Sequence, residues 1–313
     1  MMTSKNSAFG FFKRWWIYQQ ERFPIFSYGL LVFAFSSAAV IYPTFFLAIQ
    51  PRLHSLIVTF TTLFCAFLQL RIADEFKDYK HDCHYRPDRP VPRGLIQLQE
   101  LRVLEVITVF IQLVATLTLS WQLLPWLGFL WIFQALMRKE FFVRDWLRSR
   151  SLFYLLSHNL VLPLMALYGV MTNYIVVSLF PHHPQIIIFL LLSSAHGLLI
   201  EVGRKIRSPD QEIPGGETYS QMWGLNRAIL AWLNIGLISN ILSTIAFNKI
   251  EIYATPNISL VISLLSIIGL GFQILVALQV SSTQFAKRIY TFSALWVLVS
   301  YLGCGVIPWL MQR

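Results

Sequence analysis

The chain has 313 residues, of which 56% are hydrophobic and 13% charged, and its mean hydropathy is +0.59. This composition is typical of an integral membrane protein and excludes a string of soluble domains, since no polar stretch is long enough to build one. The formal net charge of +10 is compatible with nucleic acid or anionic lipid, so the placement of the basic residues decides between these partners. Three cysteines without paired spacing, Cys65, Cys83 and Cys304, predict no disulfide framework.

Residues 1–23 mix phenylalanine, tryptophan and tyrosine with Lys13, Arg14 and Arg22, which predicts a helix lying in the membrane interface. Residues 24–313 are expected to form one transmembrane domain. Apolar runs long enough to cross a bilayer predict nine helices, of which the third and fourth are the least clearly separated, at Ser120–Pro125. The predicted helices cover about 25–48, 54–73, 99–120, 123–142, 152–176, 185–203, 226–247, 257–280 and 289–310.

The basic residues predict the orientation. With the N-terminus in the cytoplasm, all but three of the 25 Lys and Arg residues lie on the cytoplasmic side, the exceptions being Arg52, Lys249 and Arg313. The net charge is therefore a topology signal, which excludes nucleic acid as a partner. We expect a multi-pass protein of a bacterial inner membrane or an organelle membrane. The basic loop MRKEFFVRDWLRSR after the fourth helix is expected to serve topology and to meet lipid headgroups.

The most charged stretch, RIADEFKDYKHDCHYRPDRPVPRG, follows directly on the second apolar run. Asp74, Asp78 and Asp82 are spaced i, i+4, i+8, which places three carboxylates on one helix face. Acids at a membrane boundary are costly and usually mark an ion or substrate site. Oxygen ligands at this density suit Mg²⁺. A solvated face bridged by Arg71, Lys77 and Lys80 is the plain alternative, and a zinc site at His81–His84 would lack its second pair of ligands.

The prolines of RPDRPVPRG end this helix and predict an extended loop that carries Arg86, Arg89 and Arg93. Guanidinium groups match phosphate oxygens. The combination of carboxylates, a bound metal ion and arginines predicts a diphosphate site at about residues 71–98.

A second charged stretch, HGLLIEVGRKIRSPDQEIPGGETYSQMWG, follows the sixth apolar run at about 196–225. Glu201 lies near Arg204 and Lys205, and a loop rich in proline and glycine follows. Two such helix ends on one side of the membrane predict an approximate duplication whose halves converge across a central cavity, although two ordinary charged loops would look similar. Tyr219 and Trp223 could close over the site as a lid hinged at Pro214–Gly216.

The first stretch, D-E-x-x-D-x-x-x-D before R-P-D-R-P, resembles the first aspartate-rich motif of the UbiA-type intramembrane prenyltransferases, N-D-x-x-D-x-x-x-D before R-P-x-R-P. Asp74 stands at the family's Asn, Glu75 at its first Asp, and Asp78 and Asp82 at the later two. The second motif is matched less closely, with Glu201 at its leading Asp and the following aspartates displaced. Gly216–Thr218 resembles the closing Gly-x-Lys-Thr/Ser, with Glu217 where Lys is usual.

The resemblance implies an all-α membrane bundle of about nine helices around a central cavity open to the cytoplasm. It also implies Mg²⁺-dependent transfer of a prenyl group from an isoprenyl diphosphate to a hydrophobic, aromatic or lipid-like acceptor. The expected metal ligands are Asp74, Glu75, Asp78, Asp82, Glu201 and Asp210, and Asp78, Asp82 and Glu201 are the expected catalytic residues. The diphosphate is expected at Lys77, Arg86, Arg89, Arg204 and Lys205.

Polar side chains within the apolar runs are candidates for contact with the acceptor, although a hydrogen bond between helices is their commoner role. They are Gln69, Tyr154, His158, Asn159, His196 and Tyr219. A membrane terpene cyclase on the same scaffold and a non-enzymatic transporter or lipid-binding protein are the alternatives. A CDP-alcohol phosphotransferase would need a longer glycine- and aspartate-spaced motif. Prenyl length, acceptor and oligomeric state do not follow from the sequence.

Overall fold

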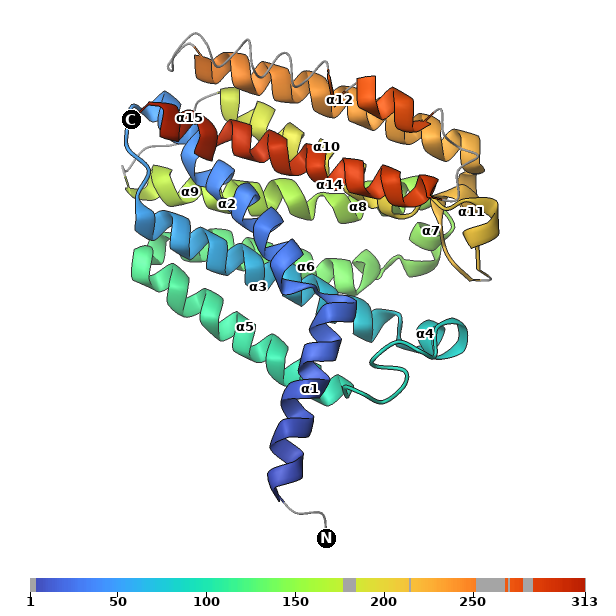
Figure 1. The fold of residues 1–313 in the computed structure, drawn as a ribbon. Coiled ribbons are helices and arrows are strands. Elements are labelled where there is room, and N and C mark those ends of the chain that lie inside the picture. The colour runs from blue at the N-terminus through green and yellow to red at the C-terminus, as the bar shows by residue number, and fades with distance from the viewer. Residues whose placement is uncertain are drawn as a thin grey trace.

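A computed structural model describes residues 4–176, 184–213, 215–251, 268–269, 271–277 and 284–312, with side chains from Gly10 onward. Every regular element in these ranges is a helix (Figure 1). The α-helices are α1 (Ser4–Arg22), α2 (Ile25–Leu47), α3 (Leu53–Lys77), α4 (Tyr79–Tyr85), α5 (Leu98–Leu119), α6 (Leu124–Arg138), α7 (Arg144–Arg148), α8 (Ser151–Asn159), α9 (Val161–Val176), α10 (Pro184–Arg204), α11 (Tyr219–Trp223), α12 (Leu225–Glu251), α14 (Phe285–Cys304) and α15 (Val306–Met311). Short 3-10 turns are η1 (Trp121–Leu123), η2 (Glu140–Phe142) and η3 (Pro209–Gln211).

Seven segments of the described chain are long and apolar enough to cross a membrane. They are Ile25–Leu47, Leu53–Lys77, Leu98–Leu119, Ser151–Ile175, Pro184–Arg204, Leu225–Ile250 and Phe285–Met311. The protein is therefore a multi-pass, all-α integral membrane protein, as the sequence predicts.

The structure follows seven of the nine expected spans closely and differs at one, the fourth. The run at 123–142 forms η1 and then α6, a helix of only 15 residues that ends at Arg138. The expected span at 257–280 lies mostly outside the described residues. The number of nine helices therefore stays a prediction.

Two of the spans are broken within the membrane, and proline explains each break. A proline ring clashes with the carbonyl four residues earlier and has no N–H to bond it. Pro163 stands four residues after Asn159, where α8 ends, and Pro308 stands four residues after Cys304, where α14 ends. Each span therefore consists of two helical pieces, α8 with α9 and α14 with α15.

The core of the bundle forms around α2, which buries a stripe of small residues at Ser36–Ala39. A Cβ added at Gly169 of α9 would lie 2.6 Å from the Cβ of Ala39, and one at Gly305 would lie 2.9 Å from the Cα of Ala38. Small residues let the backbones of membrane helices approach closely. This packing fixes α9 and the α14–α15 junction against α2.

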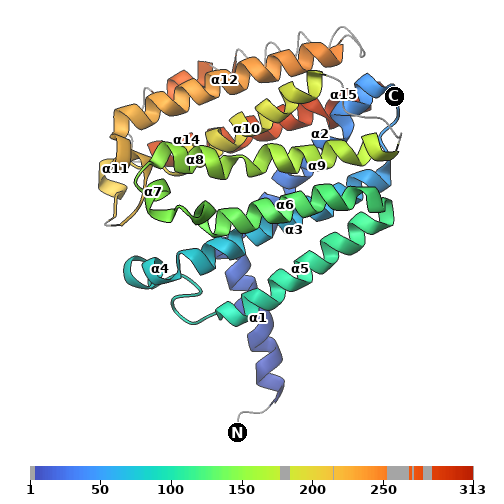
Figure 2. The ribbon, with the colours of Figure 1, turned by 180° about the vertical axis from the view of Figure 1, so that it is seen from behind.

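The short elements gather at one end of the bundle. Figures 1 and 2 show α4, α7 and α11 together at that end, called here the motif end, and the C-terminus and α15 at the other. The loops after the second, fourth and sixth expected spans thus share one side, which agrees with the distribution of Lys and Arg. In both views α1 runs across the direction of the long helices and extends away from them, the orientation expected of a helix in the membrane interface.

Candidate functional site

The first motif continues α3 beyond the apolar span. α3 ends at Lys77 and α4 begins at Tyr79, with Asp78 between them at φ −98° and ψ 5°. The backbone hydrogen bonds nevertheless keep the i to i−4 pattern, because the amides of Asp78, Asp82 and Arg86 donate to residues 74, 78 and 82 at 2.8–2.9 Å. The i, i+4, i+8 spacing of the carboxylates therefore survives the break between the two helices.

Each acid of the first motif has a basic partner. Asp74 lies 3.6 Å from both Arg71 Nη1 and Lys77 Nζ, and Asp78 lies 3.8 Å from Arg148 Nη2. These distances exceed that of a hydrogen bond, and the side chains of Asp74 and Asp78 are 43% and 33% exposed. Both carboxylates are therefore loosely paired and accessible.

The two remaining acids of this motif are buried and firmly bound. Glu75 accepts a hydrogen bond from Arg22 Nε at the end of α1, and its side chain is only 1% exposed. Asp82, 3% exposed, accepts from Arg89 Nη1 at 2.5 Å and Arg86 Nη1 at 3.4 Å. Arginine already satisfies these carboxylates, so their predicted role as metal ligands would require the ion pairs to open.

Charge around Asp78 has a consequence for protonation. Burial raises the pKa of the Asp78 carboxyl; Lys77 opposes this, and Asp74, Glu217 and Asp82 add to it. The ionised carboxylate is therefore costly in this position, and a bound cation would relieve the cost.

The second motif ends α10 with a compact ion-pair cluster. Glu201 accepts from Arg204 Nη2 at 2.6 Å and lies 3.1 Å from Lys205 Nζ. One carboxylate thus aligns two cations at the motif end of α10. Asp210, the displaced acid of this motif, is exposed in η3 and forms no ion pair with any described residue.

The loop after α10 is held by its own side chains. Glu212 accepts from Thr218 Oγ1 at 2.7 Å and from Ser220 Oγ at 2.5 Å. Tyr219 is buried and stacks on Trp223 with ring centroids 4.3 Å apart, while Trp223 Nε1 donates to Ser151 Oγ of α8 at 2.7 Å. The expected lid residues are therefore anchored against α8, and Pro214 of the expected hinge lies outside the described residues.

The two motifs meet directly. Arg86 Nη2 of the first loop donates to the backbone oxygen of Gly216 in the second at 3.0 Å. Next to it, Gly215 has φ +69°, and a Cβ there would lie 2.8 Å from the ring of Tyr85. Segments 130 residues apart in the chain thus form one polar surface.

Tyr154 and His158 of α8 also reach this surface. Lys77 Nζ donates to Tyr154 Oη at 2.7 Å, and the rings of Tyr154 and His158 stack with centroids 4.0 Å apart. Lys205 Nζ lies 5.4 Å above the ring of Tyr219. The structure therefore brings Tyr154, His158 and Tyr219 close to the predicted diphosphate-binding lysines.

The other three pocket candidates have roles between helices. Gln69 Nε2 donates to Gln112 Oε1 of α5 at 2.8 Å, and Asn159 Nδ2 donates to the backbone oxygen of Ser194 in α10 at 2.9 Å. His196 is 1% exposed and lies edge-on to Tyr301 of α14. Gln69 and Asn159 therefore form hydrogen bonds between helices, which is a commoner role for polar residues in membrane spans than contact with a substrate.

The carboxylate oxygens of the site are of the type that Mg²⁺ prefers, but they do not form a preformed coordination site. Across the described ranges, no three His, Cys, Asp or Glu side chains come close enough together to hold a metal ion. Mg²⁺ usually takes one or two carboxylates and completes its shell with water and phosphate oxygens. Asp74 and Asp78, accessible and loosely paired, fit that requirement.

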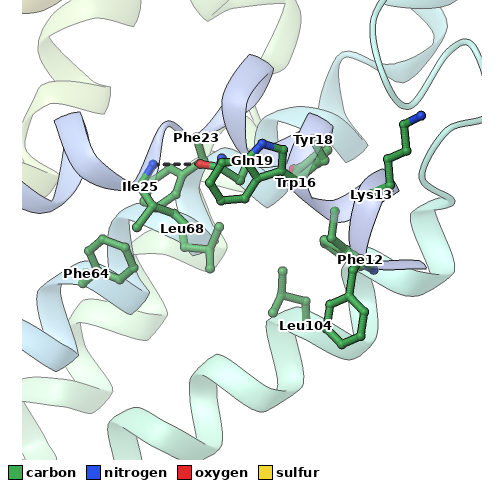
Figure 3. Close-up of a pocket in the computed structure, with 11 residues that line it drawn as sticks. Phe12, Lys13, Trp16, Tyr18, Gln19, Phe23, Ile25, Phe64, Leu68 and Leu104 are labelled. Carbon is green, nitrogen blue, oxygen red and sulfur yellow. Dashed lines mark hydrogen bonds between the residues drawn. The ribbon is translucent and has the colours of Figure 1, made fainter. Parts of the chain in front are cut away.

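A separate hollow of about 610 Å³ lies between α1, α3 and α5 (Figure 3). Phe12, Trp16, Phe64 and Leu104 line it, and its walls are almost entirely apolar. It contains no acid and only one cation, Lys13. The hollow therefore lacks the cluster of charged side chains that the sequence predicts for a diphosphate site.

Sequence reasoning missed two arginines that organise the site. Arg22 lies in the predicted interfacial segment, yet it donates to Glu75 in the bundle, and Arg148 in the basic loop approaches Asp78. Arg14 also binds the first motif loop, donating from Nε to the backbone oxygen of Leu95 at 2.7 Å. Buried charges need partners, but the first stretch carries six Lys and Arg for its five acids, so its sequence gives no signal that partners come from α1 and α7.

Comparison with known proteins shows which solved structures share this architecture. No protein-family model and no curated protein matches the sequence. Its structure is similar to a UbiA homolog from Aeropyrum pernix K1, with TM-score 0.64, 14% identity, and 87% of this chain and 96% of that one covered. It is also similar to a UbiA homolog from Archaeoglobus fulgidus bound to GPP and Mg²⁺, with TM-score 0.55, 13% identity and coverage of 92% and 99%.

A third similar structure is a digeranylgeranylglyceryl phosphate synthase, with TM-score 0.56, 15% identity and coverage of 93% and 99%. The chain is a polytopic membrane protein whose two charged loops meet at one end of a helical bundle. Its fold is that of the UbiA-type intramembrane prenyltransferases, which confirms the resemblance drawn from the first motif.

Proposed function

We propose that the protein transfers a prenyl group from an isoprenyl diphosphate to a hydrophobic acceptor within the membrane, in a reaction that requires Mg²⁺. The observation that carries the proposal is the contact between the two motif loops through Arg86 and Gly216. It joins the loop that carries Arg86 and Arg89 to the loop that follows Arg204 and Lys205, and arginine and lysine side chains are the usual partners of phosphate oxygens. A solved structure of the same fold is bound to GPP and Mg²⁺, which supports the same class of donor here.

The cations would hold the diphosphate. Arg204 and Lys205 are aligned by Glu201, and Lys77 is fixed by Tyr154. Arg86 and Arg89 are held by Asp82 in the first loop. Pre-aligned donors stabilise developing negative charge without the cost of reorganising at the moment of reaction.

Asp74 and Asp78 are the carboxylates that would hold Mg²⁺, and Glu75, Asp82, Glu201 and Asp210 stay predicted ligands that would have to move to take part. When bound, the metal ion would neutralise charge on the diphosphate oxygens. The raised pKa of Asp78 makes a cation beside it favourable, since its ionised form lacks a close partner.

Transfer would begin when the allylic C–O bond breaks and its electron pair leaves with the diphosphate held by the lysines and arginines. An electron pair of the acceptor would then form the new bond to the prenyl carbon, and the acceptor would release a proton to water at the motif end. Aromatic rings can stabilise the intermediate cation while the apolar bundle excludes water. Tyr154, His158 and Tyr219 are the candidate contacts of the reacting groups.

The direct test is diphosphate release by purified protein from geranyl, farnesyl and geranylgeranyl diphosphates, in Mg²⁺ or in EDTA. Each donor is assayed with and without a membrane-lipid extract as the source of acceptor, and products are identified by mass spectrometry. Release that needs both Mg²⁺ and extract, with a mass gain of one prenyl unit, is the expected result. Release without acceptor, with formation of a hydrocarbon, would instead identify a cyclase. If no diphosphate is released under any condition, the protein shares only the fold of these enzymes and the proposal is refuted.

A matched pair of variants tests the site. Asp78→Asn removes an accessible carboxylate of the motif surface and should lower turnover at least about 100-fold, the loss typical of removing a transition-state contact. Asp88→Asn removes a charge from the same loop at an exposed position with no side-chain partner in the described structure, and should leave turnover within about twofold. Equal activity of both variants would refute the assignment of the metal site to the first motif.

A further inference from the structure

A second hollow of about 450 Å³ lies at the motif end, between the α3–α4 junction, the start of α5, and α7. Its basic lining residues are Lys77, Lys80, His81, Arg144 and Arg148. Phe76, Tyr79 and Leu98 complete the lining, which includes no Asp or Glu. We call it the cationic pocket.

The positive charge of the cationic pocket is only partly compensated. Arg144 and Arg148 share one buried carboxylate, that of Glu140, at 3.1 and 3.2 Å. Arg148 has a second acid, Asp78, only at 3.8 Å. Lys80 is exposed and forms no ion pair with any residue that the structure describes. The pocket therefore has room and charge for an anion.

The backbone that positions these arginines is strained. Glu140, Phe141 and Phe142 have φ of 49°, 53° and 62° in succession, a left-handed conformation that residues other than glycine rarely adopt. Such strain persists only where surrounding contacts enforce it, and it concentrates at functional sites. Here the enforcing contacts are the ion pairs of the Glu140 carboxylate with Arg144 and Arg148, so the same turn that costs energy orients both guanidinium groups.

The position of the pocket identifies the kind of anion. Lys77 is the last residue of the span Leu53–Lys77, and Leu98 is the first of the span Leu98–Leu119, so the pocket lies where two spans leave the apolar layer. Phe142, Trp146 and Phe153 belong to the neighbouring η2, α7 and α8 outside the pocket lining, and are 77%, 46% and 53% exposed, as in the aromatic belts at the headgroup level of a bilayer.

We infer that the cationic pocket binds the phosphate group of a net-anionic membrane lipid in the leaflet at the motif end. Lys80, Arg144 and Arg148 contact the phosphate, and the lining side chains Phe76, Tyr79 and Leu98 lie toward the acyl chains. The inference does not depend on the proposed transferase activity, because a bound lipid at this position would serve a protein of any function with this fold.

The test uses full-length protein in detergent and native mass spectrometry. Phosphatidylglycerol is titrated against phosphatidylcholine with the same acyl chains, with the double variant Lys80→Gln, Arg144→Gln alongside the wild type. Each basic residue near an anionic headgroup strengthens binding by about fivefold, so the double variant should bind phosphatidylglycerol about 30-fold more weakly at low salt. Arg148 still binds Glu140 in this variant, and an unchanged melting temperature would show that it is folded.

The matched control, Lys139→Gln with Lys287→Gln, removes two exposed cations outside the pocket and should change binding by less than about twofold. Equal binding of both lipids by the wild type, or equal losses in the two double variants, would overturn the inference. Inorganic phosphate is added as a competitor in a separate arm. Full displacement of the lipid by phosphate at equal concentration would show that the pocket takes a soluble anion and would overturn the lipid assignment.

Discussion

Replacing Arg22 by methionine tests the buried ion pair between α1 and the bundle. Arg22 and Glu75 form an ion pair with side chains only 10% and 1% exposed. Removing one partner of such a pair leaves an uncompensated buried charge, at a cost of about 3–5 kcal/mol. For a domain of this size that loss corresponds to a fall in melting temperature of roughly 5–10 °C. The assay is thermal unfolding in detergent followed by tryptophan fluorescence, since the chain contains ten tryptophans.

Two further variants separate the buried charge from other effects. Arg22→Met combined with Glu75→Leu removes both charges, and should recover most of the lost stability, because an apolar pair of similar size is often neutral. Arg93→Gln breaks the pair between Arg93 and Glu21, whose side chains are 37% and 40% exposed, and should cost no more than about 1 kcal/mol. If Arg22→Met is no more destabilising than Arg93→Gln, the buried pair does not hold α1 in place.

The double variant also bears on the metal site. If Glu75 acts only as the anchor of Arg22, the folded double variant should keep prenyl transfer. If Glu75 is a metal ligand, as the motif resemblance implies, the double variant should be folded and inactive. Stability and turnover measured on one preparation therefore distinguish the two roles.

Three other predictions follow from the fold. In Mg²⁺-free buffer, Asp78→Asn should unfold at a higher temperature than the wild type at pH 7, because the raised pKa makes the ionised carboxylate costly in the folded state; the difference should disappear as the pH falls through that pKa toward about 4. Gly169→Val should destabilise the protein by about 1–3 kcal/mol in the same unfolding assay, because its Cβ would lie 2.6 Å from that of Ala39, whereas Gly10→Val at an open position should not. Ser151→Ala removes the acceptor of the Trp223 indole and should speed proteolysis in the second loop; an unchanged cleavage rate would mean that this hydrogen bond does not anchor it.

The sequence predicts the long helices well and their interruptions poorly. Length and apolar composition suffice for α2, α3, α5, α10 and α12, because a bilayer sets the length of an uninterrupted span. The apolar residues Phe141 and Phe142 extend the predicted fourth run beyond the end of α6 at Arg138, because their composition fits a helix although both lie in the left-handed turn. Composition does not report such a turn.

In the site too, the sequence predicts some features well and others poorly. The spacing of Asp74, Asp78 and Asp82 is a local property, so the sequence reveals it, and the fold likeness agrees with the family resemblance drawn from it. The partners of the acids, Arg22 and Arg148, come from segments 53 and 70 or more residues away and depend on how the helices pack. Long-range pairings of this kind leave no periodic signal in one sequence.

The bond from Arg86 to Gly216 ends on a main-chain oxygen, which every amino acid carries. This contact therefore constrains the path of the second loop without requiring a particular side chain at residue 216, although Gly215 beside it has no room for a Cβ next to Tyr85. Substitutions in that loop can change the chemistry of the second motif while the two halves stay joined. A poor match to the usual second motif is thus compatible with an intact junction.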